Sequence, residues 1–197
     1  TYLEILRGGG GILSTVRATR ESTESDLMAQ ALKHLDTMMC HGTTTVEIKS
    51  GYGLSVDEEL KSLRVIRELD KAHPIDVVST FMGAHAVPPE YAGDTEGYVH
   101  HIISDMIPRV GEEGLAEFCD VFCEEGVFSV TQSRRILEAG LAYGLRPRIH
   151  ADEMASLGGA ELAAEIGAVS AEHLLYASEE GIRKMAERGV VATLLPA

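Results

Sequence analysis

The sequence predicts an α/β fold of the (β/α) barrel type, present as about six βα units in one domain. Strand-like and helix-like patterns alternate along the 197 residues, which is typical of a parallel sheet. The strand-like runs are nearly continuous in Val, Ile, Leu and Phe, as expected of parallel strands buried on both faces. Polar side chains fall at the C-terminal ends of five strands, and in a barrel these ends converge on the catalytic mouth. These residues are Lys49, His85, Glu124, His150 and His173.

An open doubly wound sheet is the competing architecture. Its dinucleotide-binding loop would follow a strand, and the glycines of Gly8–Gly11 do not follow one.

A closed barrel takes eight strands and about 250 residues, so six units in 197 residues predict a segment of a longer enzyme. The start, "TYLEILRGGGG", has no signal-peptide features and is interpreted as a cut end.

Each element of the first half is predicted by its own pattern. The segment 21–42 carries an apolar stripe at helical spacing. The β-rich run Thr43–Gly53 is the first expected strand. The helix after it opens with a capping box, Ser55 and Glu58, and stops before Pro74.

The second half continues the alternation. Ile75–His85 is the second expected strand, and a proline-rich loop follows it. The next helix has an apolar face between Val99 and Ile107, ahead of a third strand at Phe118–Phe128. A second capping box, Ser129 and Gln132, opens the helix after that strand. The last three strands are expected at 146–153, 167–175 and 189–197.

Composition excludes several classes of partner. The net charge is −14, from 17 basic and 31 acidic residues, so the chain would repel nucleic-acid phosphates and anionic lipid. No apolar run is long enough to span a bilayer. The three cysteines contain no Cys-x-x-Cys pair, which favours a reducing cytoplasm without disulfides. Cys119 and Cys123 are interpreted as core or strand-end residues.

Three polar residues near the C-terminal end point to a metal-dependent site. His150 ends one strand, Glu153 follows three residues later, and His173 ends the next strand. A neutral imidazole at a strand end is a good ligand for zinc or iron, although a single histidine is more often a hydrogen-bonded core residue. Neighbouring strands lie about 4.8 Å apart, so residues at their ends can share one small ligand. The convergence of all three favours a functional site.

Other candidates are weaker. His85 ends an earlier strand, and Tyr52 stands between two glycines, where it is either exposed or a hydrogen-bond donor above a pocket. Lys49 is either a carbamylated metal ligand or, more simply, an internal salt-bridge partner. Five further histidines are interpreted as surface residues: His34, His41, His73, His100 and His101.

Five motifs in order resemble one family. "GTTTVEIKSGYGL", "DVVSTFMGAHAVPPEY", "IHADE", "LGGAELA" and "VSAEHL" are together similar to the imidazolonepropionases, metal-dependent amidohydrolases of histidine breakdown. The resemblance covers essentially the whole chain. It implies a TIM-type barrel of the amidohydrolase kind and hydrolysis of 4-imidazolone-5-propanoate to N-formimino-L-glutamate. It also implies one divalent zinc or iron ion, a cytoplasmic enzyme and a homodimer at full length.

The resemblance assigns a role to individual residues. His150 matches a metal ligand, Glu153 a catalytic glutamate that contacts the ring nitrogens, and His173 a catalytic histidine beside the attacking water. Positions that line the substrate pocket match Tyr2, Tyr52, His85 and Glu153. Members of the family also use a His-x-His pair and an Asp as ligands, and carry a small β-sandwich. These residues contain no His-x-His, and we expect neither the Asp nor the sandwich within 1–197.

Two alternatives remain open. A related amidohydrolase that deaminates an amino-heterocycle such as guanine or cytosine would share His150, Glu153 and His173. A barrel fragment without activity, which acts only by association, is the alternative of a different class, because an incomplete barrel exposes apolar edges.

Overall fold

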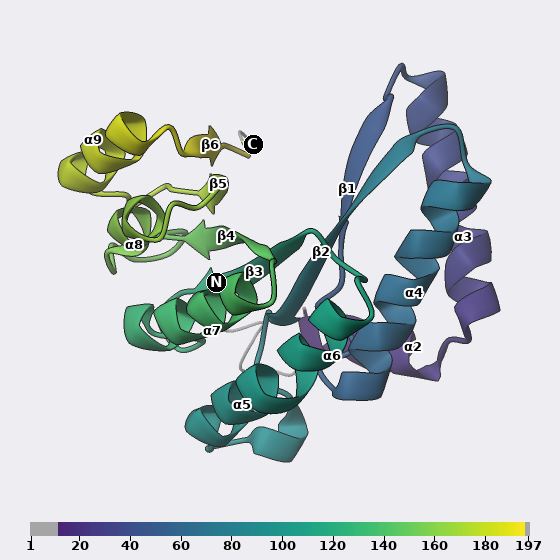
Figure 1. The fold of residues 1–197 in the computed structure, drawn as a ribbon, viewed down its shortest axis with the longest axis horizontal. Helices are drawn as coiled ribbons and strands as arrows, with labels where there is room; N and C mark the ends of the chain where they lie inside the picture. The colour runs from purple at the N-terminus through teal and green to yellow at the C-terminus, as the bar shows by residue number, and fades with distance from the viewer. Residues whose placement is uncertain (1–11, 196–197) are drawn as a thin grey trace.

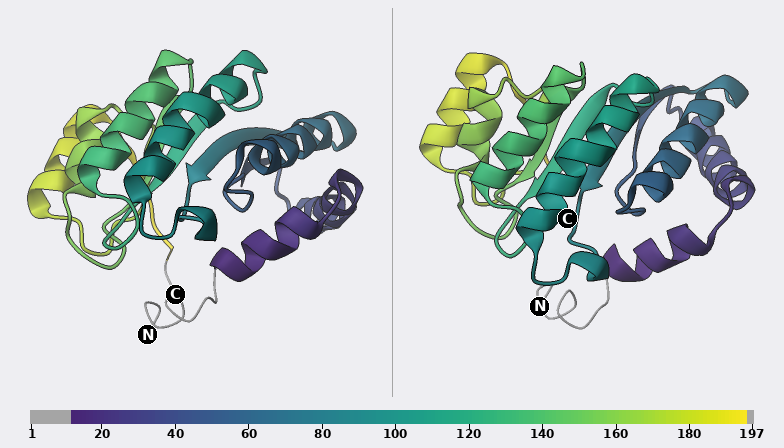
Figure 2. Two further views of the ribbon diagram at one scale, coloured as in Figure 1. Left: turned by 90° about the horizontal axis from the view of Figure 1, so that it is seen from below. Right: turned by 60° about the horizontal axis from the view of Figure 1, so that its bottom comes forward.

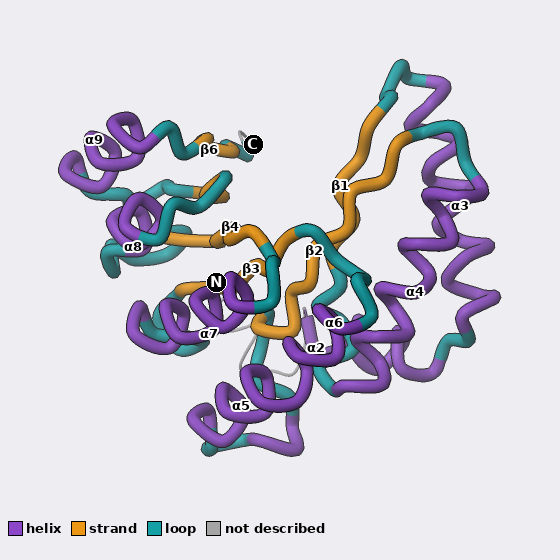
Figure 3. The backbone as a smooth tube through the Cα atoms, viewed as in Figure 1, coloured by secondary structure: helices purple, strands orange, loops and turns teal. Residues whose placement is uncertain are grey.

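The computed structural model describes residues 12–195, which form one curled parallel sheet with helices along its outer side (Figure 1). Six strands follow one another in the order β1-β2-β3-β4-β5-β6, and every neighbouring pair is parallel. Figure 3 shows the strands placed one after another around the arc. The prediction of a partial barrel of about six βα units is therefore confirmed.

The strands lie within the predicted runs but are shorter. Their bounds are β1 (Thr45–Lys49), β2 (Asp76–Ala84), β3 (Phe118–Cys123), β4 (Arg146–Ala151), β5 (Ser170–His173) and β6 (Val191–Thr193). The third predicted run, Phe118–Phe128, extends five residues beyond the end of β3. The chain turns after Cys123, where the Val127 N–H donates to the Glu124 carbonyl. Phe128 then returns to form an isolated bridge with Cys123. Apolar composition therefore located each strand but not its end.

The helices alternate with the strands and cover the outer face of the sheet (Figure 2). Their bounds are α2 (Ile12–Glu21), α3 (Glu24–Cys40), α4 (Val56–Ala72), α5 (Thr95–His101), α6 (Ile107–Glu112), α7 (Val130–Ala142), α8 (Gly159–Glu165) and α9 (Glu179–Arg188), with a 3-10 turn η1 (Pro89–Tyr91) and a π-helical turn η2 (Ile102–Met106). The stretch α5–η2–α6 is continuous, so the helix expected at Val99–Ile107 begins earlier and ends later than its apolar face indicated.

The two predicted capping boxes have different outcomes. The Ser129 hydroxyl accepts from the Gln132 N–H, and the Gln132 side chain accepts from the Ser129 N–H, so this box is confirmed. Ser55 is the N-cap residue of α4 but makes no side-chain capping bond, so that box is wrong. Glu58 forms an ion pair with Lys61 instead of reaching back.

The core lies between the sheet and the outer helices. Its largest fully buried side chains include Phe81, Tyr98 and Phe128. Cys119 and Cys123 are both buried in this core, which confirms their interpretation as structural residues. A second apolar cluster joins α3 and α4 to the β1–β2 edge of the sheet.

Contacts between non-neighbouring strands show how strongly the sheet is curled. Arg148 of β4 donates to Glu47 of β1 at 2.8 Å, although two strands separate β1 from β4 in the sheet. Neighbouring strands lie about 4.8 Å apart, so a flat sheet would hold these two strands about 14 Å apart. The side chains therefore meet across the concave inner side.

None of the helices in residues 12–195 combines the length and hydropathy that crossing a bilayer requires.

Candidate active site

A layer of polar side chains lines the inner side of the curled sheet. Successive residues of a strand point to opposite faces, so polar residues two apart share the inner face. These residues are Glu47 and Lys49 of β1, Asp120 of β3, Arg148 and His150 of β4, and Ser170 and Glu172 of β5. The strands were expected to be nearly continuous in apolar residues and buried on both faces; β3 to β5 are largely buried, but the inner face carries polar side chains.

Lys49 is an internal salt-bridge partner. Its ammonium donates to Glu47 at 2.7 Å and to Asp120 at 2.8 Å. Burial by itself lowers the pKa of Lys49, but the charges and hydrogen bonds of Asp120 and Glu47 outweigh it, so the pKa is raised. A lysine that keeps its proton is a poor target for carbamylation, and of the two readings of Lys49 the salt bridge is the one observed.

Asp120 orients the imidazole of His150. Its second oxygen accepts a hydrogen bond from Nδ1 of His150 at 3.0 Å, and the carboxylate is fully buried. Burial alone would raise the pKa of Asp120, but His150 and Lys49 lower it to about 2. For His150, burial lowers the pKa and Asp120 raises it by more, so the net direction is upward. With Nδ1 occupied in this way, Nε2 is the nitrogen left for a ligand.

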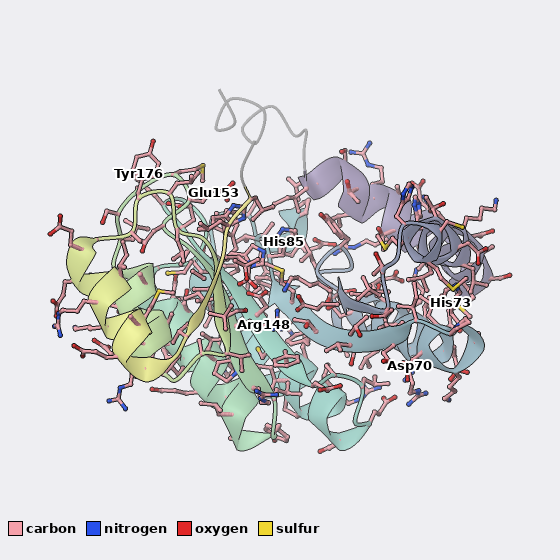
Figure 4. All side chains as sticks on the ribbon, turned by 90° about the horizontal axis from the view of Figure 1, so that it is seen from above. Asp70, His73, His85, Arg148, Glu153 and Tyr176 are labelled. Atoms are coloured by element: carbon pink, nitrogen blue, oxygen red, sulfur yellow. The ribbon has the colours of Figure 1, made fainter. Side chains whose placement is uncertain are left out.

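Glu153 and His173 lie beside His150. The rings of His150 and His173 are 5.4 Å apart between centroids, and Nδ1 of His173 is 3.6 Å from Oε1 of Glu153. Burial lowers the pKa of His173 more than the Glu153 carboxylate raises it. His173 is therefore mostly neutral at pH 7, with a ring nitrogen able to accept a proton. The structure brings the three predicted residues together at the ends of β4 and β5. Of these three, Figure 4 labels Glu153, together with His85 and Arg148.

The backbone at these strand ends is strained. His173 has a φ of +71° and Asp152 a φ of +50°, in the left-handed region that side chains other than glycine rarely adopt. Such a conformation costs on the order of 1–2 kcal/mol for a residue with a Cβ atom. Strain of this kind concentrates at functional sites, which supports the assignment of this region.

Aromatic and imidazole rings extend the site toward β1. His85 meets the Phe122 ring edge-on at 6.3 Å, and Phe122 in turn meets His150 at 6.4 Å. On its other side His85 lies 5.1 Å from Tyr52, again edge-on. Nδ1 of His85 donates to the Gly51 carbonyl at 3.0 Å, which leaves Nε2 as an acceptor. Burial lowers the pKa of His85, so this ring is mostly neutral at pH 7.

Two expectations from the sequence have other outcomes, and a third is not tested. Glu124 does not face the mouth, because its buried carboxylate accepts backbone N–H groups of the next loop. His73 is not a surface residue, since its side chain is only 5% exposed and bonds to Asp36 and to the Ile75 N–H. Tyr2 lies outside the described residues.

One group of side chains in residues 12–195 has the composition of a metal site. Ligand-type atoms of Asp120, His150 and Glu172 lie within 4.8 Å of one another. Both oxygens of Asp120 are already engaged by Lys49 and His150, so Asp120 would have to give up one of these hydrogen bonds to bind a metal ion. Burial, and then the charge of Asp120, raises the pKa of Glu172, whose Oε2 has no hydrogen-bond partner. His150 is the best ligand of the three.

Three further residues lie at the candidate site that the sequence did not predict there: Asp120, Phe122 and Glu172. The signal for the two acids was present, because each interrupts an apolar strand at a position facing inward. Nothing in the sequence alone distinguishes Phe122, whose role depends on its position between His85 and His150.

No family model matches the chain. It is 61% identical over 196 residues to "Imidazolonepropionase" of Geobacillus sp. (strain WCH70), which covers 100% of this chain and 46% of that protein. It is also 61% identical over 195 residues to "Imidazolonepropionase" of Alkaliphilus metalliredigens (strain QYMF), covering 99% of this chain and 46% of the relative. The resemblance seen in the motifs is thus confirmed, and the chain spans about half the length of these curated relatives.

Solved structures support the fold. A 5-methylcytosine deaminase from Klebsiella pneumoniae matches with a TM-score of 0.64 and 17% identity, over 88% of this chain and 44% of that one. An adenine deaminase from Arthrobacter aurescens matches with a TM-score of 0.65 and 11% identity, over 92% of this chain and 56% of that one. At such low identity these likenesses support the architecture alone.

Proposed function

We propose that the chain is the part of an imidazolonepropionase that supplies His150, Glu153 and His173, and that the protein at its full natural length hydrolyses 4-imidazolone-5-propanoate to N-formimino-L-glutamate. The observation that carries the proposal is the convergence of these three side chains in a chain about 60% identical to imidazolonepropionases. The alternative of a fragment that acts only by association offers no reason for this grouping.

The residues present fit a divalent metal in part. The Asp120 carboxylate holds Nδ1 of His150, so the ring can offer Nε2 to a metal ion that displaces the Nε2 proton. The remaining protein ligands are expected outside these residues. Zinc or iron, when bound, would polarise the attacked carbonyl and lower the pKa of water toward about 7.

His173 and Glu153 divide the proton transfers. His173 is mostly neutral at pH 7, so it can orient the attacking water and take its proton. The proton that His173 takes from water passes to the Glu153 carboxylate, 3.6 Å away, and from Glu153 to the departing ring nitrogen as the C–N bond breaks. The tetrahedral species gains a negative oxygen, and a protonated His173 stabilises this charge.

Tyr52 and His85 bind the substrate on the β1–β2 side of the mouth. His85 offers Nε2 as an acceptor for a ring N–H, while Tyr52 packs edge-on against the His85 ring. Tyr2 is assigned the same task from the resemblance. We further propose one metal ion per site, a homodimer at full length and a cytoplasmic location, the last supported by three free cysteines.

The test is an assay of the protein at its full natural length. Purified protein with zinc or iron is incubated with 4-imidazolone-5-propanoate, and N-formimino-L-glutamate is quantified. Guanine and cytosine are assayed in parallel for release of ammonia. Formation of N-formimino-L-glutamate that is lost in Glu153→Gln but kept in the exposed control Glu125→Gln supports the proposal. Deamination without ring opening contradicts it, and so does inactivity on every substrate.

A further inference from the structure

Two buried carboxylates lie behind the loops that carry the proposed site residues. Glu59, in the first turns of α4, and Glu124, directly after β3, are each 1% exposed. Among the described residues neither forms a salt bridge to Lys, Arg or His. Both are instead surrounded by backbone N–H groups of a neighbouring loop.

Glu124 holds the loop that follows β4. Its Oε2 accepts from the N–H groups of Glu153 at 2.9 Å and Met154 at 2.8 Å. Its Oε1 accepts from the Glu125 N–H at 2.7 Å. Hydrogen bonds to an ionised acceptor are roughly twice as strong as neutral ones, so the two from Glu153 and Met154 fix the main chain at Glu153, while the third orders the chain next to Glu124 itself.

Glu59 holds the loop that follows β1. Its carboxylate accepts from the N–H groups of Gly51 at 3.0 Å, Gly53 at 2.8 Å and Leu54 at 2.8 Å. Tyr52 stands in the middle of these donors. The carbonyl of Gly51 is also the acceptor for Nδ1 of His85, so Glu59 fixes the surroundings of both Tyr52 and His85.

Burying a carboxylate is energetically unfavourable. Removing an ionised group from water costs several kcal/mol unless its hydrogen bonds compensate for this cost. An apolar side chain of similar volume would pack without that cost. It would, however, leave without this acceptor three N–H groups in the loop after β1, and at Glu124 two in the loop after β4 and that of Glu125. The value of Glu59 and Glu124 therefore lies in the loop geometry that they impose.

We propose that Glu124 and Glu59 are positioning residues with separate tasks: Glu124 places Glu153 for proton transfer, and Glu59 places Tyr52 and His85 for substrate binding. The inference rests on the proposed function. Glu153 must remain close to His173, and a displacement of about 1 Å can cost about 100-fold in rate. Loss of Glu124 should therefore act on kcat, and loss of Glu59 on KM.

The experiment compares Glu124→Gln and Glu59→Gln in the protein at its full natural length. Each glutamine keeps one accepting oxygen but presents an NH2 group to a remaining backbone donor. The matched controls are Glu125→Gln, an exposed carboxylate beside Glu124, and Asp57→Asn, an exposed carboxylate in the first turn of α4. Thermal unfolding verifies that each variant is folded at the assay temperature. If either glutamine variant does not fold, the aspartate at the same position carries the same expectation.

Two measurements decide the proposal. Steady-state kinetics should show kcat lower by about 10- to 100-fold in Glu124→Gln with KM within about 3-fold, and KM higher by about 10-fold in Glu59→Gln with kcat nearly unchanged. Amide hydrogen exchange, followed by mass spectrometry, should become faster at residues 152–155 in the first variant and at residues 50–54 in the second.

Each outcome has a definite meaning. Unchanged exchange at these loops overturns the proposal, as does faster exchange with unchanged kinetics, or equal changes of kcat and KM in both variants. If the wild-type protein does not hydrolyse the imidazolone, the proposed function fails. Exchange alone then decides whether the carboxylates position the loops, because it does not depend on the substrate.

Discussion

Asp120→Asn removes one charge from the centre of the inner polar layer with little change in shape. The wild-type carboxylate accepts from Lys49 and from His150. An asparagine has one oxygen and one NH2 group, so it can accept from only one of these donors, and its NH2 group then faces the other. Because the position is fully buried, water cannot relieve the conflict.

The structure gives the size of the effect. The pKa of Asp120 falls from 3.8 to about 2, and one pKa unit corresponds to about 1.4 kcal/mol, so its surroundings favour the ionised form by about 2–3 kcal/mol. Breaking a buried ion pair costs about 3–5 kcal/mol when the remaining charge is stranded. Lys49 keeps Glu47 at 2.7 Å and is 23% exposed, so we expect a loss of about 2–3 kcal/mol at pH 7.

Urea denaturation followed by circular dichroism, repeated from pH 7 to pH 2, measures this loss. A carboxyl with a depressed folded pKa stabilises above its unfolded pKa of 3.8, and this stabilisation disappears as the pH falls toward about 2. The contribution of His150 to stability depends on pH in the opposite direction. Because the pKa of His150 is raised in the folded protein, this contribution is fully present below pH 6.5 and is lost as the pH rises through the pKa of the folded state. The difference between wild type and Asp120→Asn should therefore be largest between pH 4 and 6 and shrink below pH 4.

The exposed control Asp57→Asn should show no such difference. A free energy of unfolding within about 0.5 kcal/mol of wild type at pH 7 would refute the reasoning, because surface substitutions alone fall in that range. Acid curves that run parallel for the two proteins would refute it as well.

Three further outcomes are expected. In the protein at its full natural length, Glu153→Gln and His173→Ala should each lower turnover by about 100-fold or more, as loss of an acid–base group does. Near wild-type turnover in either variant would remove that residue from the proposed mechanism. A chelator should abolish turnover and added zinc or iron should restore it, whereas activity that resists chelation would count against the metal. Gly159→Ala should lower the unfolding free energy by about 1–3 kcal/mol, because its Cβ would lie 2.6 Å from that of Ala151, and an unchanged melting temperature would contradict this.

The strands were predictable because their apolar runs are long and regularly spaced. The N-terminal capping of the helices was less predictable, as α4 illustrates. Ser55 followed by Glu58 matches the capping-box pattern, yet Glu58 forms an ion pair with Lys61. The N–H groups ahead of that helix are satisfied by Glu59 instead, one position later. Sequence spacing shows which residues can reach a donor but not which residue another partner has already engaged.

At the site, position along a strand predicted proximity but not orientation. His150, Glu153 and His173 come together because parallel neighbouring strands end at the same level. Glu124 directly follows β3 at the same level, yet its side chain does not face the mouth. Its carboxylate instead accepts hydrogen bonds from two N–H groups of the loop after β4. Asp120 and Glu172 were overlooked because the strands were assumed to be apolar on both faces.

The agreement between sheet order and chain order has a consequence for how the protein acquires its structure. Among the described strands, each of β2 to β6 pairs with the strand made just before it, so the backbone pairing of the sheet joins only consecutive strands. Structure can therefore accumulate unit by unit from the N-terminal side as the chain leaves the ribosome. The proposed catalytic loops follow β4 and β5, late in that succession, so they become ordered only on a scaffold that has already formed.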